Sequence, residues 1–159
     1  MDRRSIVSGI SVATGARGQA ADTPSIGDRL IGVWNLLTLQ VTIEGEIFHP
    51  YGEHPVGRLT YDAAGRTSAH VMKPGRQSSV TNPSAVSTAT EDQVRQIADG
   101  YVGYYGSFSV EGDAVTHHIE ACTLPAWTGT DQERQCEFVG DQLVLRFGPN
   151  KLVRERLSD

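Results

Sequence analysis

Apolar and polar side chains alternate along most of the chain beyond residue 30, in short runs that end at turn residues. A period of two is typical of β-strands that bury one face. Glycine-containing turns, such as 62–65 and 111–113, join successive runs closely enough for hairpins. The pattern predicts about eight antiparallel strands, at 31–43, 56–61, 66–72, 104–110, 114–122, 130–139, 142–147 and 151–157.

One segment has a helical period instead. Thr90 and Gln93 have the spacing of a capping box. The positions that follow at i, i+3, i+4 and i+7 predict a helix that ends near Gly100: Val94, Ile97, Ala98 and Tyr101. The preceding segment 73–89 is rich in Ser, Thr and Pro, which predicts an exposed loop long enough to serve as a lid. The fold class is therefore all-β, a sandwich or barrel with one short helix between its early and late strands.

Length and charge narrow the classes of function. The 159 residues suit one domain, and the formal net charge is −5 with no basic run, which argues against a nucleic-acid or anionic-membrane partner. No apolar stretch is long enough to span a bilayer. A small apolar or weakly acidic ligand fits this balance, with the protein a monomer or homodimer.

The N-terminal segment has two interpretations. Arg3-Arg4 precedes a weakly apolar stretch and a small-residue site at 18–21, as in a twin-arginine export signal, although the bulky apolar pair that usually follows the arginines is missing. The alternative is a disordered tail. Export makes the protein periplasmic or secreted, and a tail leaves it cytoplasmic. Either way, we expect residues 1–25 to lie outside the domain, which covers 26–159.

Several short motifs resemble the bacterial and fungal lipocalin-like domain family. Gly32-Val33-Trp34 opens the first strand, and further motifs follow in order: Pro50-Tyr51-Gly52, Gly57-Arg58-Leu59-Thr60-Tyr61, Gly65-Arg66, Tyr104-Tyr105-Gly106-Ser107-Phe108, Thr116-His117-His118-Ile119-Glu120 and Pro125-Ala126-Trp127-Thr128-Gly129. The resemblance covers nearly all of residues 30–157 and implies a single eight-stranded antiparallel barrel. It also implies that Trp34 closes one end against an arginine of the last strand, for which we choose Arg156. Two positions depart from the family, Cys136 and Arg154, where aromatic residues are expected. The resemblance implies no single reaction.

Strand alternation predicts which polar residues face the interior. His117 shares a face with Val115 and Ile119, whereas His118 falls on the polar face. Arg134 falls among the inward positions of strand 130–139 with Gln132, and an inward arginine needs a partner. If the hairpin pairs evenly about its loop, Arg134 lies opposite His117. Such a pair either binds an acidic group of the ligand or belongs to an internal polar cluster. Considered by itself, His117 is either a core histidine or an acid/base group.

Further candidates surround this pair. In the hairpin 56–72, a four-residue turn places Tyr61 on the inner face with Ser68, His70 and Met72; a shift of one residue exposes His70 instead. Tyr51 and Trp127 lie in loops, where we expect them at the barrel mouth. The predicted ligand-binding set is His117, Arg134, Tyr61, His70, Gln132, Tyr105, Trp127 and Tyr51.

Two cysteines complete the chemistry of the chain. Cys136 is expected to face inward and Cys122 outward, too far apart for a disulfide, so we predict free thiols. No Cys/His pair has zinc-ligand spacing, and no phosphate loop, nucleophile elbow or dinucleotide fingerprint is present, so we expect no metal and no cofactor.

Two functions remain open. One is a binding protein that holds a small, largely apolar molecule in the barrel. The other is a cofactor-free isomerase, cyclase or dehydratase, with His117 as acid/base and Arg134 or Tyr61 stabilising the developing charge.

Overall fold

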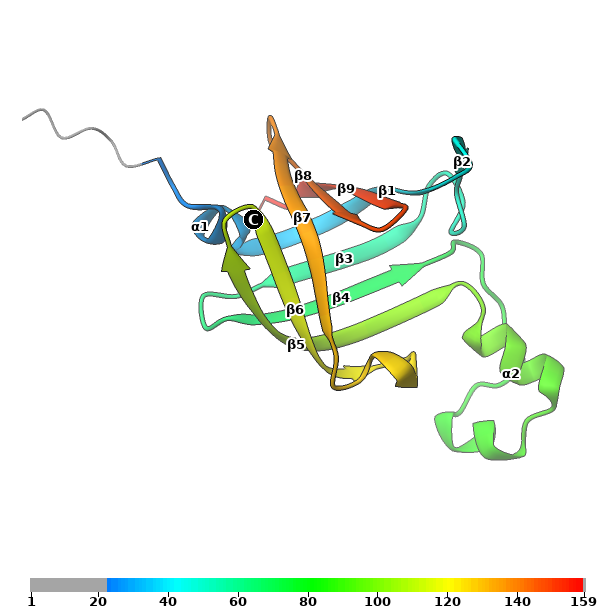
Figure 1. Ribbon diagram of the computed structural model, residues 1–159. Coiled ribbons are helices and arrows are strands. Elements are labelled where there is room, and N and C mark those ends of the chain that lie inside the picture. Colours follow the sequence, from blue (N-terminus) through cyan, green and yellow to red (C-terminus); the bar gives the residue numbers. More distant parts are fainter. Residues whose placement is uncertain (1–22, 159) are drawn as a thin grey trace, which may run out of the picture.

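The computed structural model describes residues 23–158, which form one closed antiparallel barrel (Figure 1). Strand follows strand in chain order around the barrel, and β1 pairs with both β3 and β9 to close it. Eight strands make the wall, and β2 is an extra strand beside the end of β1. The strands are β1 (Gly32–Ile43), β2 (Glu46–Phe48), β3 (Val56–Tyr61), β4 (Arg66–Met72), β5 (Tyr101–Glu111), β6 (Ala114–Cys122), β7 (Asp131–Val139), β8 (Gln142–Phe147) and β9 (Asn150–Arg156).

The helical segments are short and lie outside the wall. They are α1 (Ile26–Leu30), η1 (Pro83–Thr88), α2 (Glu91–Ala98) and η2 (Pro125–Trp127). The capping box of Thr90 and Gln93 begins α2 as predicted. No helix among residues 23–158 is both long and apolar enough to cross a bilayer. The predicted tail, residues 1–25, lies almost wholly outside the described residues.

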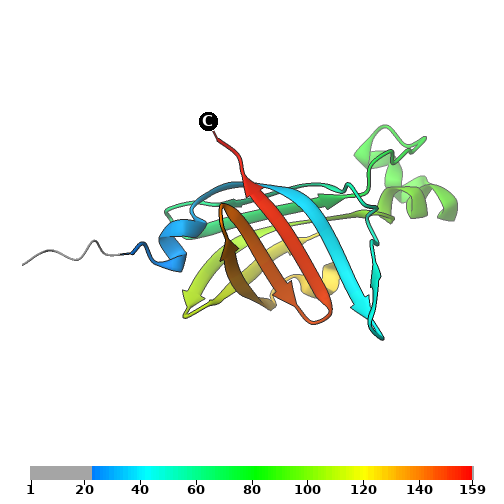
Figure 2. The ribbon, with the colours of Figure 1, turned by 90° about the horizontal axis from the view of Figure 1, so that it is seen from above.

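One end of the barrel is plugged. The indole of Trp34 is 1% exposed and donates a hydrogen bond from Nε1 to the Leu30 carbonyl oxygen of α1 (2.8 Å). The guanidinium carbon of Arg156 lies 4.3 Å from the indole ring centroid, and Arg156 also donates to the carbonyl oxygens of Ile31 and Arg29. Figure 2 shows α1 at the left-hand end of the barrel, beside the start of β1. The structure thus places Arg156 over Trp34 at this end of the barrel.

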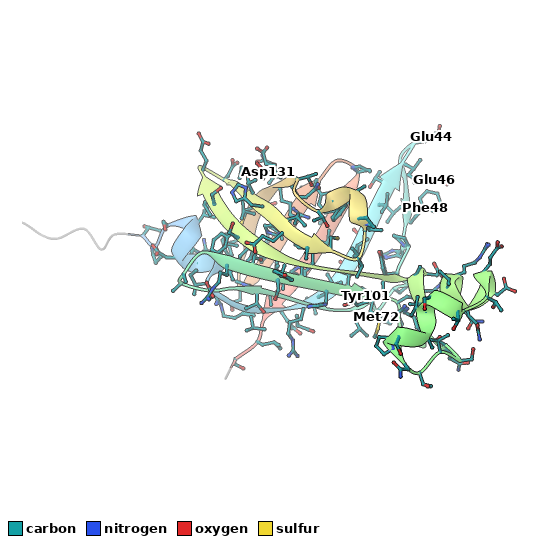
Figure 3. All side chains as sticks on the ribbon, turned by 90° about the horizontal axis from the view of Figure 1, so that it is seen from below. Glu44, Glu46, Phe48, Met72, Tyr101 and Asp131 are labelled. Atoms are coloured by element: carbon teal, nitrogen blue, oxygen red, sulfur yellow. The ribbon has the colours of Figure 1, made fainter. Side chains whose placement is uncertain are left out.

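The segment 73–100 extends away from the other end of the barrel. Figure 3 shows it beyond the strand ends at Met72 and Tyr101. It has no buried residue in either η1 or α2, and none of the residues that line the interior cavity comes from it. In this structure the segment therefore does not cover the cavity as a lid.

The register of the β3–β4 hairpin differs from the predicted one. Tyr61 pairs with Thr67, so the inward residues of β4 are Thr67, Ala69 and Val71, and His70 lies on the outer face. The cause is the turn, in which Asp62 bonds across to Arg66 and Gly65 adopts a φ of +81°. This left-handed glycine adds the extra residue of a bulge, which reverses the alternation of the following strand.

The β6–β7 pairing also differs from the even hairpin. His117 lies opposite Gln132, and Arg134 lies opposite Val115 rather than His117. Pairing already ends near Ile119, which exchanges backbone hydrogen bonds with Gly129 and Thr130. A shift of two residues keeps every side chain on its face, so His117 and Arg134 both remain inward, at 0% and 4% exposure.

A register irregularity in the β5–β6 pair changes the environment of Cys122. The pairing shifts between Tyr105 and Gly106, and Cys122 lies opposite the inward Tyr104. Cys122 therefore packs against the core instead of facing outward as expected. Cys122 and Cys136 are free thiols, as predicted.

Candidate functional site

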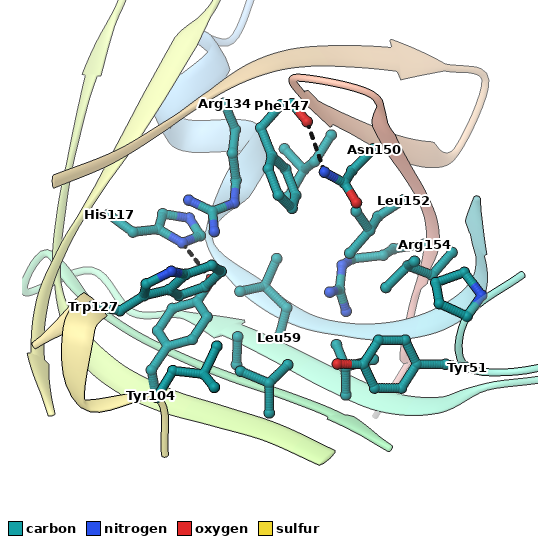
Figure 4. A pocket seen from close by; sticks show the side chains of 17 residues that line it. Tyr51, Leu59, Tyr104, His117, Trp127, Arg134, Phe147, Asn150, Leu152 and Arg154 are labelled. Carbon is teal, nitrogen blue, oxygen red and sulfur yellow. Dashed lines mark hydrogen bonds between the residues drawn. The ribbon is translucent and has the colours of Figure 1, made fainter. Parts of the chain in front are cut away.

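The barrel interior holds a cavity of about 250 Å³ at the end opposite Trp34 (Figure 4). The wall is mostly aliphatic and aromatic, with polar groups on β5, β6, β7 and β9. The 17 lining residues are Leu39, Pro50, Tyr51, Leu59, Ala69, Val71, Val102, Tyr104, His117, Leu124, Trp127, Arg134, Leu145, Phe147, Asn150, Leu152 and Arg154.

His117 lies between two tyrosines. Its Nε2 is 2.6 Å from the Tyr61 hydroxyl and its Nδ1 is 2.7 Å from the Tyr104 hydroxyl. Tyr61 is fully enclosed behind the cavity wall, whereas Tyr104 is part of the wall. His117 itself lines the cavity, but both of its ring nitrogens are bonded to tyrosine hydroxyl groups.

Two arginines point into the same space. Arg134 donates from Nη1 to the Gln132 carbonyl oxygen (2.6 Å), and its guanidinium carbon lies 4.8 Å from the ring centroid of Phe147. Arg154 is 2% exposed, and its buried Nε and Nη1 atoms have no hydrogen-bond partner. In Figure 4 the two guanidinium groups project from opposite sides of the cavity. The lining residues include no Asp or Glu.

Burial sets the charge states of this cluster. The pKa of His117 is lowered well below 6.5, mainly by burial and to a smaller extent by the positive charges of Arg134 and Arg154. Its imidazole is therefore neutral at pH 7. Burial raises the pKa of Tyr61 and of Tyr104, against a smaller lowering by the two arginines. Burial also lowers the pKa of Arg154 to about 10, so Arg154 keeps its charge at pH 7. The cavity thus holds two cations and no fixed anion.

The other predicted site residues divide between the two faces of the wall. Tyr51 and Trp127 line the cavity, and Tyr61 supports it from behind. Gln132 is half-buried and bonded to Thr130, and it is not among the lining residues, contrary to the prediction. His70 and Tyr105 are exposed on the outer face, and His70 lies 2.8 Å from the Tyr101 hydroxyl. These two residues therefore lie outside the cavity for which they were predicted.

Two important residues were missing from the predicted set. Tyr104 belongs to the same motif as Tyr105, and the alternation of β5 puts only one of the two inside the barrel. Arg154 shares its parity on β9 with Leu152, which is also buried, and with Arg156, which is exposed, and the sequence already contains this parity. Among residues 23–158, no group of three His, Cys, Asp or Glu side chains is placed to hold a metal ion.

A closed antiparallel barrel with one plugged end and an internal cavity defines a lipocalin-like protein. The model of the lipocalin-like domain family matches residues 31–156, and the chain belongs to this family. No curated protein matches the sequence.

Two solved structures are similar in fold. One is a lipocalin-like protein from Bacteroides uniformis ATCC 8492, with 14% identity, a TM-score of 0.47 and coverage of 81% of this chain and 99% of that one. The other is an uncharacterized protein from Bacteroides eggerthii DSM 20697, with 14% identity, a TM-score of 0.45 and coverage of 80% and 99%.

Proposed function

We propose that the protein binds a small, largely apolar molecule inside the barrel. The observation that supports this function is the cavity itself, which is about 250 Å³ in volume and lined mainly by apolar side chains. Ligand pockets have this character, with a few polar groups that orient the ligand. The volume lies just below the usual range of roughly 300–1,000 Å³, which favours a single-ring or short-chain compound.

Fluorescence quenching tests this function. Trp127 lines the cavity, whereas Trp34 is buried at the plugged end. A nitroaromatic compound such as 4-nitroanisole should therefore quench the emission of Trp127 and leave a Trp127→Phe variant unaffected. Ala69→Leu fills part of the cavity and should weaken binding, whereas Ala63→Leu in an exposed turn should not. Saturable binding that is unchanged in Ala69→Leu places the ligand elsewhere and refutes the proposal.

The Tyr61–His117–Tyr104 chain of hydrogen bonds favours a second candidate, a cofactor-free isomerase, cyclase or dehydratase. In this mechanism Tyr104 exchanges a proton with the substrate, His117 acts as acid/base through Tyr104, and Arg134 stabilises negative charge, while Tyr61, behind the cavity wall, acts only through its hydrogen bond to His117. Enol–keto tautomerisation of phenylpyruvate, followed by enol absorbance, is a suitable assay. Acceleration that is lost in Tyr104→Phe, His117→Ala and Arg134→Ala supports catalysis. Equal rates with and without the protein remove this candidate for that reaction.

A further inference from the structure

The polar part of the cavity contains more N–H donors from arginine than the protein provides with hydrogen-bond acceptors. Arg154 has two buried nitrogens without a partner, and Arg134 has one hydrogen bond, to a backbone carbonyl. No carboxylate is among the lining residues. A buried cation without a partner is costly, and both arginines are at least 96% buried by exposed area. The Gln132 carbonyl and the Phe147 ring contact Arg134, but the lining residues offer neither arginine a negatively charged partner.

Tyr104 adds a neutral donor to this wall. A neutral imidazole has one donor nitrogen and one acceptor nitrogen, so one tyrosine donates to His117 and the other accepts from it. Each of the two hydroxyl groups has His117 as its only hydrogen-bond partner among the described residues, but Tyr61 is enclosed whereas Tyr104 lines the cavity, which favours Tyr61 as the donor to Nε2. His117 then donates from Nδ1 to the Tyr104 oxygen. The Tyr104 hydroxyl hydrogen is left free to point into the cavity.

We propose that Arg134, Arg154 and Tyr104 bind the ionised acid group of the ligand, which is a small organic anion of the carboxylate, phenolate or enolate class. This inference deepens the proposed function and rests on it. Guanidinium groups suit planar, delocalised oxyanions because they present several N–H donors in one plane. The aliphatic and aromatic remainder of the cavity then holds the body of the same molecule, with Trp127 and Tyr51 on its wall.

The arrangement has a consequence for the ionisation of a bound weak acid. Two nearby positive charges favour the anionic form of an acid that enters the cavity. A weak acid should therefore bind as its anion even at a pH where it is mostly protonated in solution. The neutral isostere of the same molecule gains nothing from the arginines.

The test uses 4-nitrophenol and its methyl ether, 4-nitroanisole, which have similar shapes but differ in the ability to ionise. We expect 4-nitrophenol to bind at least ten-fold more tightly and to show the long-wavelength absorption of its phenolate when bound, at a pH where the free compound is mostly neutral. Arg154→Met and Arg134→Met should each remove that absorption and reduce the affinity to that of 4-nitroanisole. Arg146→Met, on the outer face of β8 near Glu137, is the matched control and should change neither.

The possible outcomes separate the two proposals. If both compounds quench Trp127 with equal affinity and no phenolate absorption develops, the anion site is refuted and the apolar binding function stands. If 4-nitrophenol is preferred but Arg154→Met and Arg134→Met both keep that preference, the anion binds elsewhere and the assignment to these residues is refuted. If neither compound quenches Trp127, the proposed binding function fails for compounds of this size and the anion site fails with it.

Discussion

Replacing Arg154 by methionine should make the ligand-free protein more stable. Arg154 is 2% exposed, and burial lowers its pKa from the ordinary arginine value to about 10. One pKa unit corresponds to about 1.36 kcal/mol, so burial disfavours the charged side chain by about 3 kcal/mol. Methionine keeps an unbranched apolar stem in the same space. Since some packing is lost with the guanidinium group, we expect the free energy of unfolding to rise by about 1–3 kcal/mol.

Thermal unfolding followed by circular dichroism measures this effect. In a chain of this size, each kcal/mol shifts the Tm by roughly 2–4 °C. The proteins should first be unfolded and refolded, because a retained ligand stabilises the native state by mass action and would mask the difference. The binding experiment described above should show the opposite change, a loss of anion affinity in the same variant.

Arg156→Met is the control for this prediction. Arg156 lies on the same strand and at the same parity, but it donates to the Ile31 and Arg29 carbonyl oxygens and lies over the Trp34 ring. Its replacement should lower the free energy of unfolding by about 1–3 kcal/mol. If Arg154→Met destabilises the ligand-free protein as much as Arg156→Met does, the Arg154 guanidinium has partners in solution and the reasoning is refuted.

Three further predictions concern the wall and the buried groups. Gly106→Ala should cost at least about 3 kcal/mol because a Cβ would overlap a backbone carbonyl of β6, whereas Gly112→Ala, in an open turn at φ +61°, should cost about 1–2 kcal/mol. Below pH 6.5, His117 should lower the free energy of unfolding by up to about 1.4 kcal/mol for each pH unit, because His117 takes up a proton in the unfolded state and not in the folded state. The variant His117→Gln should remove this contribution. A thiol reagent at pH 8 should label Cys122 first and should label Cys136 only when the protein unfolds, because burial raises the pKa of Cys136 to about 11. Equal labelling rates for the two cysteines would contradict this prediction.

Alternation and capping were sufficient to predict the barrel strands and α2, because these signals are local. The strand spacing alone left sandwich and barrel open, and the motifs that begin with Gly32-Val33-Trp34 decided for the barrel. Pairing register was less predictable, since it depends on how each turn is built. In the β3–β4 hairpin a single left-handed glycine, Gly65, moves His70 from the inner face to the outer one. Helix α1 was not predicted, although Ser25 and Asp28 have the spacing of a capping box.

The candidate site was predictable only where one strand decides it. Parity on single strands was enough to place His117 and Arg134 inside the barrel. The hydrogen-bonded cluster around His117 was not predictable, because Tyr61, Tyr104 and His117 come from three strands and meet only when the barrel closes. Tyr104 was passed over for Tyr105 because the two adjacent tyrosines are indistinguishable without knowledge of which face of β5 is inside.

A comparison of two arginines of β9, the buried Arg154 and the exposed Arg156, shows why the cavity end is the place to look for function. Arg156 has its partners within the protein, two backbone carbonyls and an indole ring, so the fold accounts for its charge. Arg154, two residues earlier, lies between Leu36 of β1 and Leu143 of β8 in the sheet and has no such partner for two of its nitrogens. An apolar residue at position 154 would serve the stability of the barrel better. A charge that the fold does not need is explained most simply by a bound molecule, and the two cations of the cavity favour the organic anion that we propose.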